Sequence, residues 1–151
     1  MGTKDELGKQ IEELFRVLPL EQAMSTLVGA RSLDTSSMVQ RIEAVPEVLA
    51  GLWLYVDDLD RSHTISQDIH SPTGSYWHAI MHRREGDFWN SKYWFHKVGD
   101  HPVIGLLGYD PSVFVDQCES DQGRNAAELV EIQRQEWKAL FDWSLKEASG
   151  A

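Results

Sequence analysis

At 151 residues the chain fits one domain, and a domain of this length buries roughly two-thirds of the surface that its unfolded chain exposes. Its formal net charge of -10 opposes binding to nucleic-acid phosphates and to anionic membrane surfaces. The single cysteine, Cys118, excludes an internal disulfide and a cysteine-rich metal site. The N-terminus is polar and no apolar run approaches membrane-spanning length, so we expect a cytoplasmic protein without a membrane span.

Helix start and stop signals recur along the chain and predict an all-α fold, a single domain over residues 1–151 with six to eight helices in an orthogonal or bundle-like array. Thr3 with Glu6 has the pattern of a capping box, and Pro19 ends the apolar periodicity that follows. No alternating pattern typical of a strand has useful length. The predicted helices cover residues 3–18, 20–28, 35–44, 47–67, 72–85, 88–98, 111–119 and 125–146.

Two of these helices bear on function. Pro46 opens the helix that runs to about Gln67, and its first half is apolar enough to be central and buried. Ser71 and Pro72 are typical of an N-cap followed by proline at the first helical position, and Gly86 stands where a left-handed C-terminal residue belongs. The second helix is therefore expected over residues 72–85.

The remainder of the chain is expected to be helical with one interruption. Asp87 can cap the helix that ends at Gly99, and residues 100–109 are expected to form a loop. Asn125 with Glu128 predicts a second capping box, which would begin the last helix.

All six histidines lie between His63 and His101. On the 72–85 helix, His78, His82 and Glu85 fall on one stripe because the helical pitch is about 3.6 residues. Two imidazoles at this spacing can bind one divalent metal ion, with Glu85 as a third ligand or as a base. The alternative is that the histidines are hydrogen-bonded within an aromatic core.

The 47–67 helix offers further ligands for the same ion. Asp60 and His63 lie on a polar stripe of that helix, and consecutive helices tend to be antiparallel neighbours. Asp60 and His63 could therefore meet His78 and His82. Such a mixture of oxygen and nitrogen donors suits zinc, iron or manganese.

Local positive charge accompanies the histidines. Arg84 and Lys92 could orient a small anionic molecule, framed by Tyr76 and Trp94, because arginine suits bidentate contact with carboxylate or phosphate. In the alternative interpretation, Arg83 and Arg84 pair with Glu85 and Asp87 at the helix end, and the aromatic rings are core residues.

The run from Ser71 to Asp87, SPTGSYWHAIMHRREGD, is continued by NSKYWF at residues 90–95. It resembles an uncharacterised family of small bacterial and fungal proteins with a similar Tyr-Trp-His…His-Arg-Arg-Glu-Gly-Asp…Asn…Lys-Tyr-Trp pattern. The resemblance covers about residues 53–103. It implies no activity, and it assigns no residue a catalytic role.

The sequence thus predicts a small helical metal-binding protein or a metal-dependent enzyme of hydrolase or lyase type that acts on a small anionic substrate. The alternative is a non-catalytic binding or interaction module in which the same residues form a structural network. The expected metal ligands are His78, His82, His63 and Asp60. The expected catalytic residues are Glu85, Arg84 and Lys92.

Overall fold

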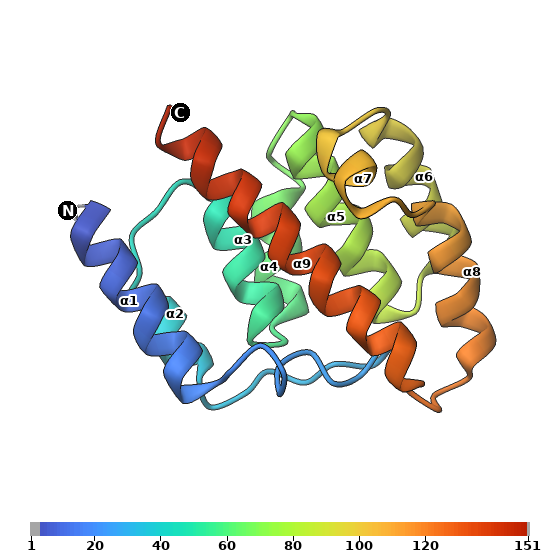
Figure 1. Cartoon of the computed structure of the whole chain (residues 1–151), viewed down its shortest axis with the longest axis horizontal. Helices are drawn as coiled ribbons and strands as arrows, with labels where there is room; N and C mark the ends of the chain where they lie inside the picture. Colours follow the sequence, from blue (N-terminus) through green and yellow to red (C-terminus); the bar gives the residue numbers. More distant parts are fainter. Residues whose placement is uncertain (1–3, 151) are drawn as a thin grey trace.

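The computed structural model describes residues 4–150, and within them the chain forms nine helices and no strand (Figure 1). The predicted all-α class is confirmed, with one helix more than the upper expected number. The helices are α1 (Lys4–Val17), α2 (Ser36–Gln40), α3 (Pro46–Tyr55), α4 (Leu59–Ser66), α5 (Pro72–Glu85), α6 (Phe88–Val98), α7 (Pro102–Leu107), α8 (Pro111–Asp121) and α9 (Ala127–Ala148).

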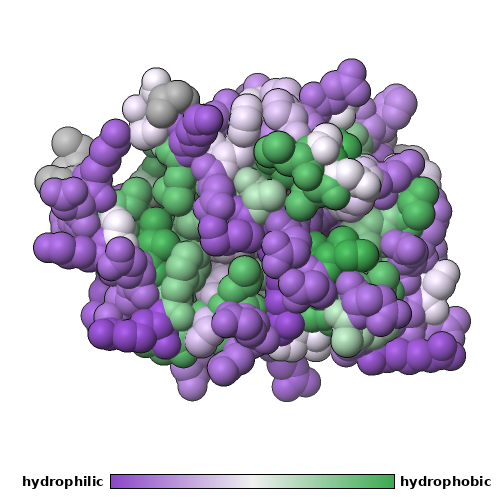
Figure 2. Space-filling view, viewed as in Figure 1, coloured by the Kyte–Doolittle hydropathy of each residue, from purple (hydrophilic) through white to green (hydrophobic). Residues whose placement is uncertain are grey.

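The long helix α9 crosses the front of the molecule, with α1 and α2 on one side and α6, α7 and α8 on the other (Figure 1). Apolar residues are exposed over the region of α7 and in the trough between α1 and α9 (Figure 2). That trough is a cleft lined by apolar side chains that include Leu7, Ile11 and Leu145. Within the described range, no helix combines the length and the apolar character needed to cross a bilayer.

The core is centred on α3, as its apolar sequence predicts. Gly51 permits the close packing here, because a Cβ at this position would lie 2.7 Å from the ring of Trp77 on α5. Its carbonyl accepts a hydrogen bond of 2.7 Å from the indole of Trp137 on α9. The three helices are therefore held together at a point where only glycine fits.

The predicted continuous helix over residues 47–67 is wrong, because α3 and α4 are separated by a turn. Asp57 adopts a left-handed conformation (φ 63°). Its amide donates to Leu54, and the amide of Asp58 donates to Trp53, which is the Schellman arrangement that ends a helix. The Asp58 carboxylate then accepts from the amide of Arg61 and caps the start of α4.

The turn between α5 and α6 repeats this arrangement 29 positions later in the chain (57 to 86, 58 to 87). Gly86 is left-handed (φ 90°), its amide donates to Arg83, and the amide of Asp87 donates to His82. Asp87 then caps α6 by accepting from the amide of Asn90. The predicted bounds of this helix pair are confirmed.

The two helix pairs share one more contact. The buried hydroxyl of Ser62 donates to the carbonyl of Ala50, and that of Ser91 donates to the carbonyl of Ala79. These residues are also related by 29 positions (62 to 91, 50 to 79). The sequence alone gave no indication of a repeat, because few side chains match between the two halves.

The predicted helix over residues 20–28 does not form. Side chains of α9 bind the backbone here: Gln133 donates to the carbonyls of Met24 and Thr26, and Arg134 donates to the carbonyl of Ala23. Carbonyls that accept from side chains leave this segment as a series of turns. The predicted helix over residues 35–44 is shortened to α2.

Three other local predictions remain to be compared with the structure: two are wrong, and one concerns a residue outside the described range. Residues 102–107 form α7 rather than part of a loop, because the His101 ring accepts from the amide of Val103 as an N-cap. Asn125 does not cap α9: its side chain accepts from Leu27, while its amide donates to the carboxylate of Asp121. Thr3, the first predicted cap, lies outside the described residues.

Candidate metal centre

Three histidines from two helices converge on one position. His63 comes from α4, and His78 and His82 come from successive turns of α5. One ring nitrogen from each can be chosen so that all three lie within 4.8 Å of one another. The ring centroids are 4.9 Å apart for His63 and His78, 5.3 Å for His63 and His82, and 4.7 Å for His78 and His82.

Local structure explains this convergence. The spacing of four residues places His78 and His82 on one face of α5, whose start is fixed by Ser71 as N-cap and Pro72 at the first position. His63 reaches them because the turn at Asp57 folds α4 back beside α5. The structure thus brings together three of the four predicted metal ligands.

His78 is the most enclosed member of the cluster. It is 4% exposed, and its ring stacks on Trp94 of α6 at a centroid distance of 4.0 Å and an interplanar angle of 22°. Burial, together with the neighbouring His82 and His63, lowers the pKa of His78 to about 4. Its Nδ1 is buried without a hydrogen-bond partner. A neutral imidazole with a buried unpaired nitrogen is in the protonation state that metal binding requires.

His82 is oriented by a carboxylate. Its Nδ1 lies 2.6 Å from Oε1 of Glu85, one turn further along α5. A carboxylate bound to one ring nitrogen favours the tautomer in which the other nitrogen is free to act as a ligand. Glu85 is therefore placed to orient His82, and His82, Glu85 and Asp87 form a second group of close donor atoms.

Asp87 in that second group already has partners. Its carboxylate accepts from the side-chain amide of Asn90 at 2.6 Å and from the backbone amide of Asn90 at 3.2 Å. The side-chain hydrogen bond is the main cause that lowers the pKa of Asp87. These contacts cap α6, so the all-nitrogen group is the better candidate for an ion.

Asp60 does not join the histidines. It is exposed in the first turn of α4, and it belongs to neither group of close donor atoms found among residues 4–150. Asp60 precedes His63 by three residues on α4, but its side chain is exposed to solvent, whereas the His63 ring lies beside His78 and His82 of α5.

The two cations predicted to orient an anion are engaged elsewhere. Arg84 is fully buried and donates to the carbonyl of Leu54 and to the carboxylate of Asp57. Lys92 is exposed and pairs with Asp116 on α8. Neither position supports the predicted contact with a substrate.

Arg83 is equally buried but faces α9. Its guanidinium donates to both oxygens of Glu136, at 3.0 and 2.8 Å, and stacks over the ring of Phe114. Tyr109 also donates to Glu136, and its hydroxyl contacts that of Tyr76. Thus the arginines do form ion pairs, but with Glu136 and Asp57 rather than with Glu85 and Asp87.

Glu136 and the stacking of Trp94 on His78 were not predicted from the sequence. For Glu136 a signal existed, because Gln133 and Glu136 share the helical stripe of the apolar Trp137 and Leu140. Polar residues on an inward stripe need buried partners. For Trp94 no sequence pattern indicates which ring it would contact.

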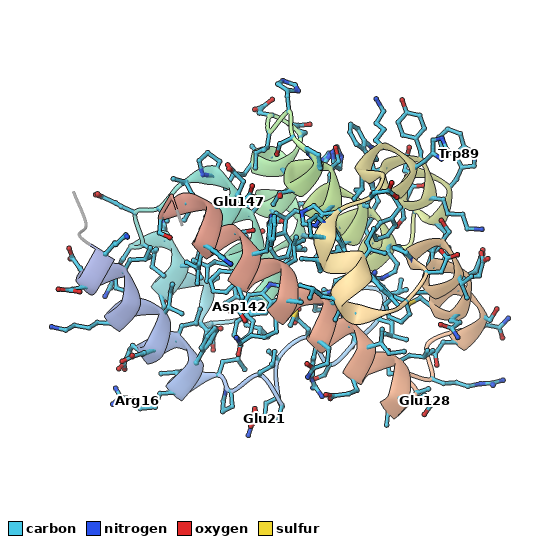
Figure 3. The ribbon with its side chains drawn as sticks, turned by 45° about the horizontal axis from the view of Figure 1, so that its top comes forward. Arg16, Glu21, Trp89, Glu128, Asp142 and Glu147 are labelled. Atoms are coloured by element: carbon cyan, nitrogen blue, oxygen red, sulfur yellow. The ribbon has the colours of Figure 1, made fainter. Side chains whose placement is uncertain are left out.

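A cleft of about 670 Å³ lies away from the three histidines, between the ends of α3, α5, α7 and α9. Thr73, buried His101 and Glu147 line it, and Glu147 lies near the C-terminal end of α9 (Figure 3). The Thr73 hydroxyl is 3.0 Å from both His101 Nε2 and a Glu147 oxygen. Because His101 Nδ1 accepts from Val103, the neutral ring carries its proton on Nε2 and donates to Thr73. His101 therefore cannot accept the Thr73 proton, which argues against a catalytic triad in this cleft.

Comparison with protein-family models, with curated proteins and with solved structures found no match of any kind. The resemblance of residues 53–103 to a family of small bacterial and fungal proteins therefore stays a prediction.

Proposed function

We propose that this protein binds a divalent metal ion, with zinc as the first candidate, through His63, His78 and His82. The observation that carries the proposal is the approach of ring nitrogens from His63, His78 and His82 to within 4.8 Å of one another, in a cluster where the buried Nδ1 of His78 has no hydrogen-bond partner. Buried polar atoms are nearly always paired, and a metal ion would satisfy this one. Three imidazoles without a thiolate suit zinc or copper better than manganese.

We propose further that the centre is catalytic, of the hydrolase or lyase class, and acts on a small anionic substrate. Structural zinc sites have four protein ligands, whereas catalytic sites have three and keep one position open. A bound metal would supply Lewis acidity and attract an anion. Glu85 orients His82 and, being 41% exposed at its side chain, can also exchange a proton with solvent or substrate.

The alternative is a non-catalytic module in which the histidines are structural. The stacking of His78 on Trp94 and the buried pairing of Arg83 with Glu136 favour it. In that case the histidines contribute to packing and the protein needs no metal for its role.

Elemental analysis of protein purified without an affinity tag separates these two possibilities. We expect close to one equivalent of metal per chain, lost in His63→Ala, His78→Ala and His82→Ala. His70→Ala and His96→Ala are matched controls, because both residues are exposed outside the cluster. Metal-free wild-type protein that neither gains zinc nor changes its melting temperature with zinc would contradict the proposal, and unfolding of the alanine variants would favour the structural role.

The catalytic part has its own test. Zinc-loaded protein is assayed against a panel of small carboxylate- and phosphate-bearing esters, with chelated protein as the blank. We expect turnover that is lost in His78→Ala and reduced in Glu85→Gln. Stoichiometric zinc without turnover across the panel would limit the function to metal binding.

A further inference from the structure

Arg84 connects the two helices that carry the histidines. It lies two residues after His82 on α5, fully buried, with Nη1 2.8 Å from the carbonyl of Leu54. Nη2 donates to the carboxylate of Asp57. The carbonyl belongs to the last turn of α3 and the carboxylate to the turn that follows it, so one guanidinium ties α5 to the segment that leads to His63.

That turn determines where α4 begins. Asp57 is left-handed, a conformation that residues other than glycine seldom adopt. Asp58, the next residue, caps α4, and His63 follows five positions later. A change in the conformation of Asp57 would therefore move the start of α4 and the imidazole that it carries.

We propose that the Arg84–Asp57 pair is a positioning element for the metal centre and that it sets the metal affinity by holding His63 against His78 and His82. The proposal rests on the metal-binding function proposed above. Arg84 touches none of the three rings in this role; it acts through the backbone of the turn. Ligands must be held to within a fraction of an ångström for tight binding, so a loosely held third ligand weakens the site.

The test is a double-mutant cycle on zinc affinity, measured by competition with a chromophoric chelator. Asp57→Gly keeps the left-handed conformation of the turn but removes the carboxylate that ties the turn to Arg84 on α5, so it tests the tie alone, and it is combined with His63→Ala. We expect Asp57→Gly to weaken zinc binding about tenfold, the lower end of the range for residues that orient ligands. In the His63→Ala background it should produce no further loss, because the ligand that it positions is gone.

Arg84→Met provides the reciprocal variant and should show the same dependence on His63. Glu136→Gln is the matched control, because it weakens the partner of the adjacent Arg83 without contacting the α3–α4 turn. We expect Glu136→Gln to lower thermal stability while leaving zinc affinity within twofold of wild type. If Asp57→Gly or Arg84→Met does not fold, the cycle is repeated with Asp57→Asn. Its neutral side chain tolerates the left-handed conformation.

Three results would overturn the positioning role: wild-type affinity in both variants, an equal loss with and without His63, or an equal loss in Glu136→Gln. The metal-binding proposal is tested separately, by the zinc binding of the wild type and of the histidine variants alone. A wild type that binds zinc through three histidines but is insensitive to Asp57 leaves the metal centre intact and removes only the role of the pair.

Discussion

The turns between α3 and α4 and between α5 and α6 have the same backbone hydrogen bonds but different residues at the left-handed position. In the second turn that residue is Gly86, which adopts the conformation without steric cost. In the first it is Asp57, held by the buried Arg84 from another helix. One turn is encoded locally, and the other depends on a contact across the core.

The two helix pairs also differ in what they carry. Where α5 has His78 and His82, the positions 29 residues earlier on α3 are Leu49 and Trp53. The first pair therefore forms the centre of the core, and the second pair provides two of the three convergent imidazoles. One backbone arrangement thus carries apolar core residues at these positions of α3 and imidazoles at the matching positions of α5, and the third imidazole, His63, comes from α4 of the first pair.

The largest effect is expected from the contact on which the first turn depends. Arg84→Met leaves the Asp57 carboxylate, of which 11% is exposed, without its buried partner. We expect a loss of about 3 kcal/mol in the free energy of unfolding, the cost of breaking a buried pair by removing one member. Urea denaturation followed by circular dichroism measures it, and the double variant with Asp57→Asn should recover part of the loss. A loss below about 0.5 kcal/mol would show that the first turn is as self-sufficient as the second.

Lowering the pH should reduce the free energy of unfolding through the second helix pair, because His78 lies on α5 and the first pair has leucine at the matching position. Its pKa is lowered to about 4 in the folded protein from 6.5, so the unfolded chain binds a proton between these values and the folded protein does not. This contribution to stability is complete above about pH 6.5 and is lost as the pH falls towards 4. We expect a loss of about 2 kcal/mol in metal-free protein between pH 7 and pH 4.

The measurement is urea denaturation across that pH range in the presence of a chelator. His78→Leu copies the residue found at the corresponding position of α3 and should reduce the pH dependence by the stated amount. If the free energy of unfolding of His78→Leu depends on pH as strongly as that of the wild type, then groups other than His78 cause the dependence.

A smaller effect is expected at the second turn. Gly86→Ala forces a side chain into a conformation with φ 90° and brings its Cβ to 3.2 Å from Val28. The expected cost is about 1–2 kcal/mol in the free energy of unfolding. Gly105→Ala in α7 is the control, because Gly105 has open space around it and no positive φ, so the substitution should be neutral or slightly stabilising. Equal results for the two variants would contradict a special requirement at Gly86.

The smallest effects are expected where the two pairs match. Ser62→Ala and Ser91→Ala each remove one buried hydroxyl that donates to a helix carbonyl, at 2.8 and 2.7 Å. Each should cost about 1 kcal/mol, the net value of a typical hydrogen bond. Thermal denaturation measures the loss of stability in each variant. Losses that differ by more than about 1 kcal/mol would show that the hydrogen bond contributes unequally to the stability of the two helix pairs.

Prediction from the sequence succeeded where local signals were complete. The bounds of α5 and α6 follow from Ser71, Pro72, Gly86 and Asp87, each of which acts within a few residues of its own position. It failed at Asp57, because aspartate is no stop signal unless a partner such as Arg84 holds it. It failed also over residues 20–28, where α9, more than 100 residues away, takes the backbone carbonyls.

The candidate site shows the same division. The helical spacing of His78 and His82 is a local property, and the sequence placed both on one face of one helix. Asp60 was predicted as a ligand and lies exposed outside the cluster, because the packing of α4 against α5 decides which side chains of α4 face the histidines. Arg84 was predicted to face a substrate, and its environment is set by residues 27 and 30 positions earlier in the chain.

The sequence by itself determined the all-α class, the extent of the histidine helix and the pair His78 and His82, because helical periodicity and capping are encoded within one or two turns. Only the tertiary structure decided that His63 completes the cluster, that Trp94 stacks on His78, and that both arginines are buried in ion pairs. The physical reason is that a buried charge or ring is defined by its partners, and here those partners come from other helices.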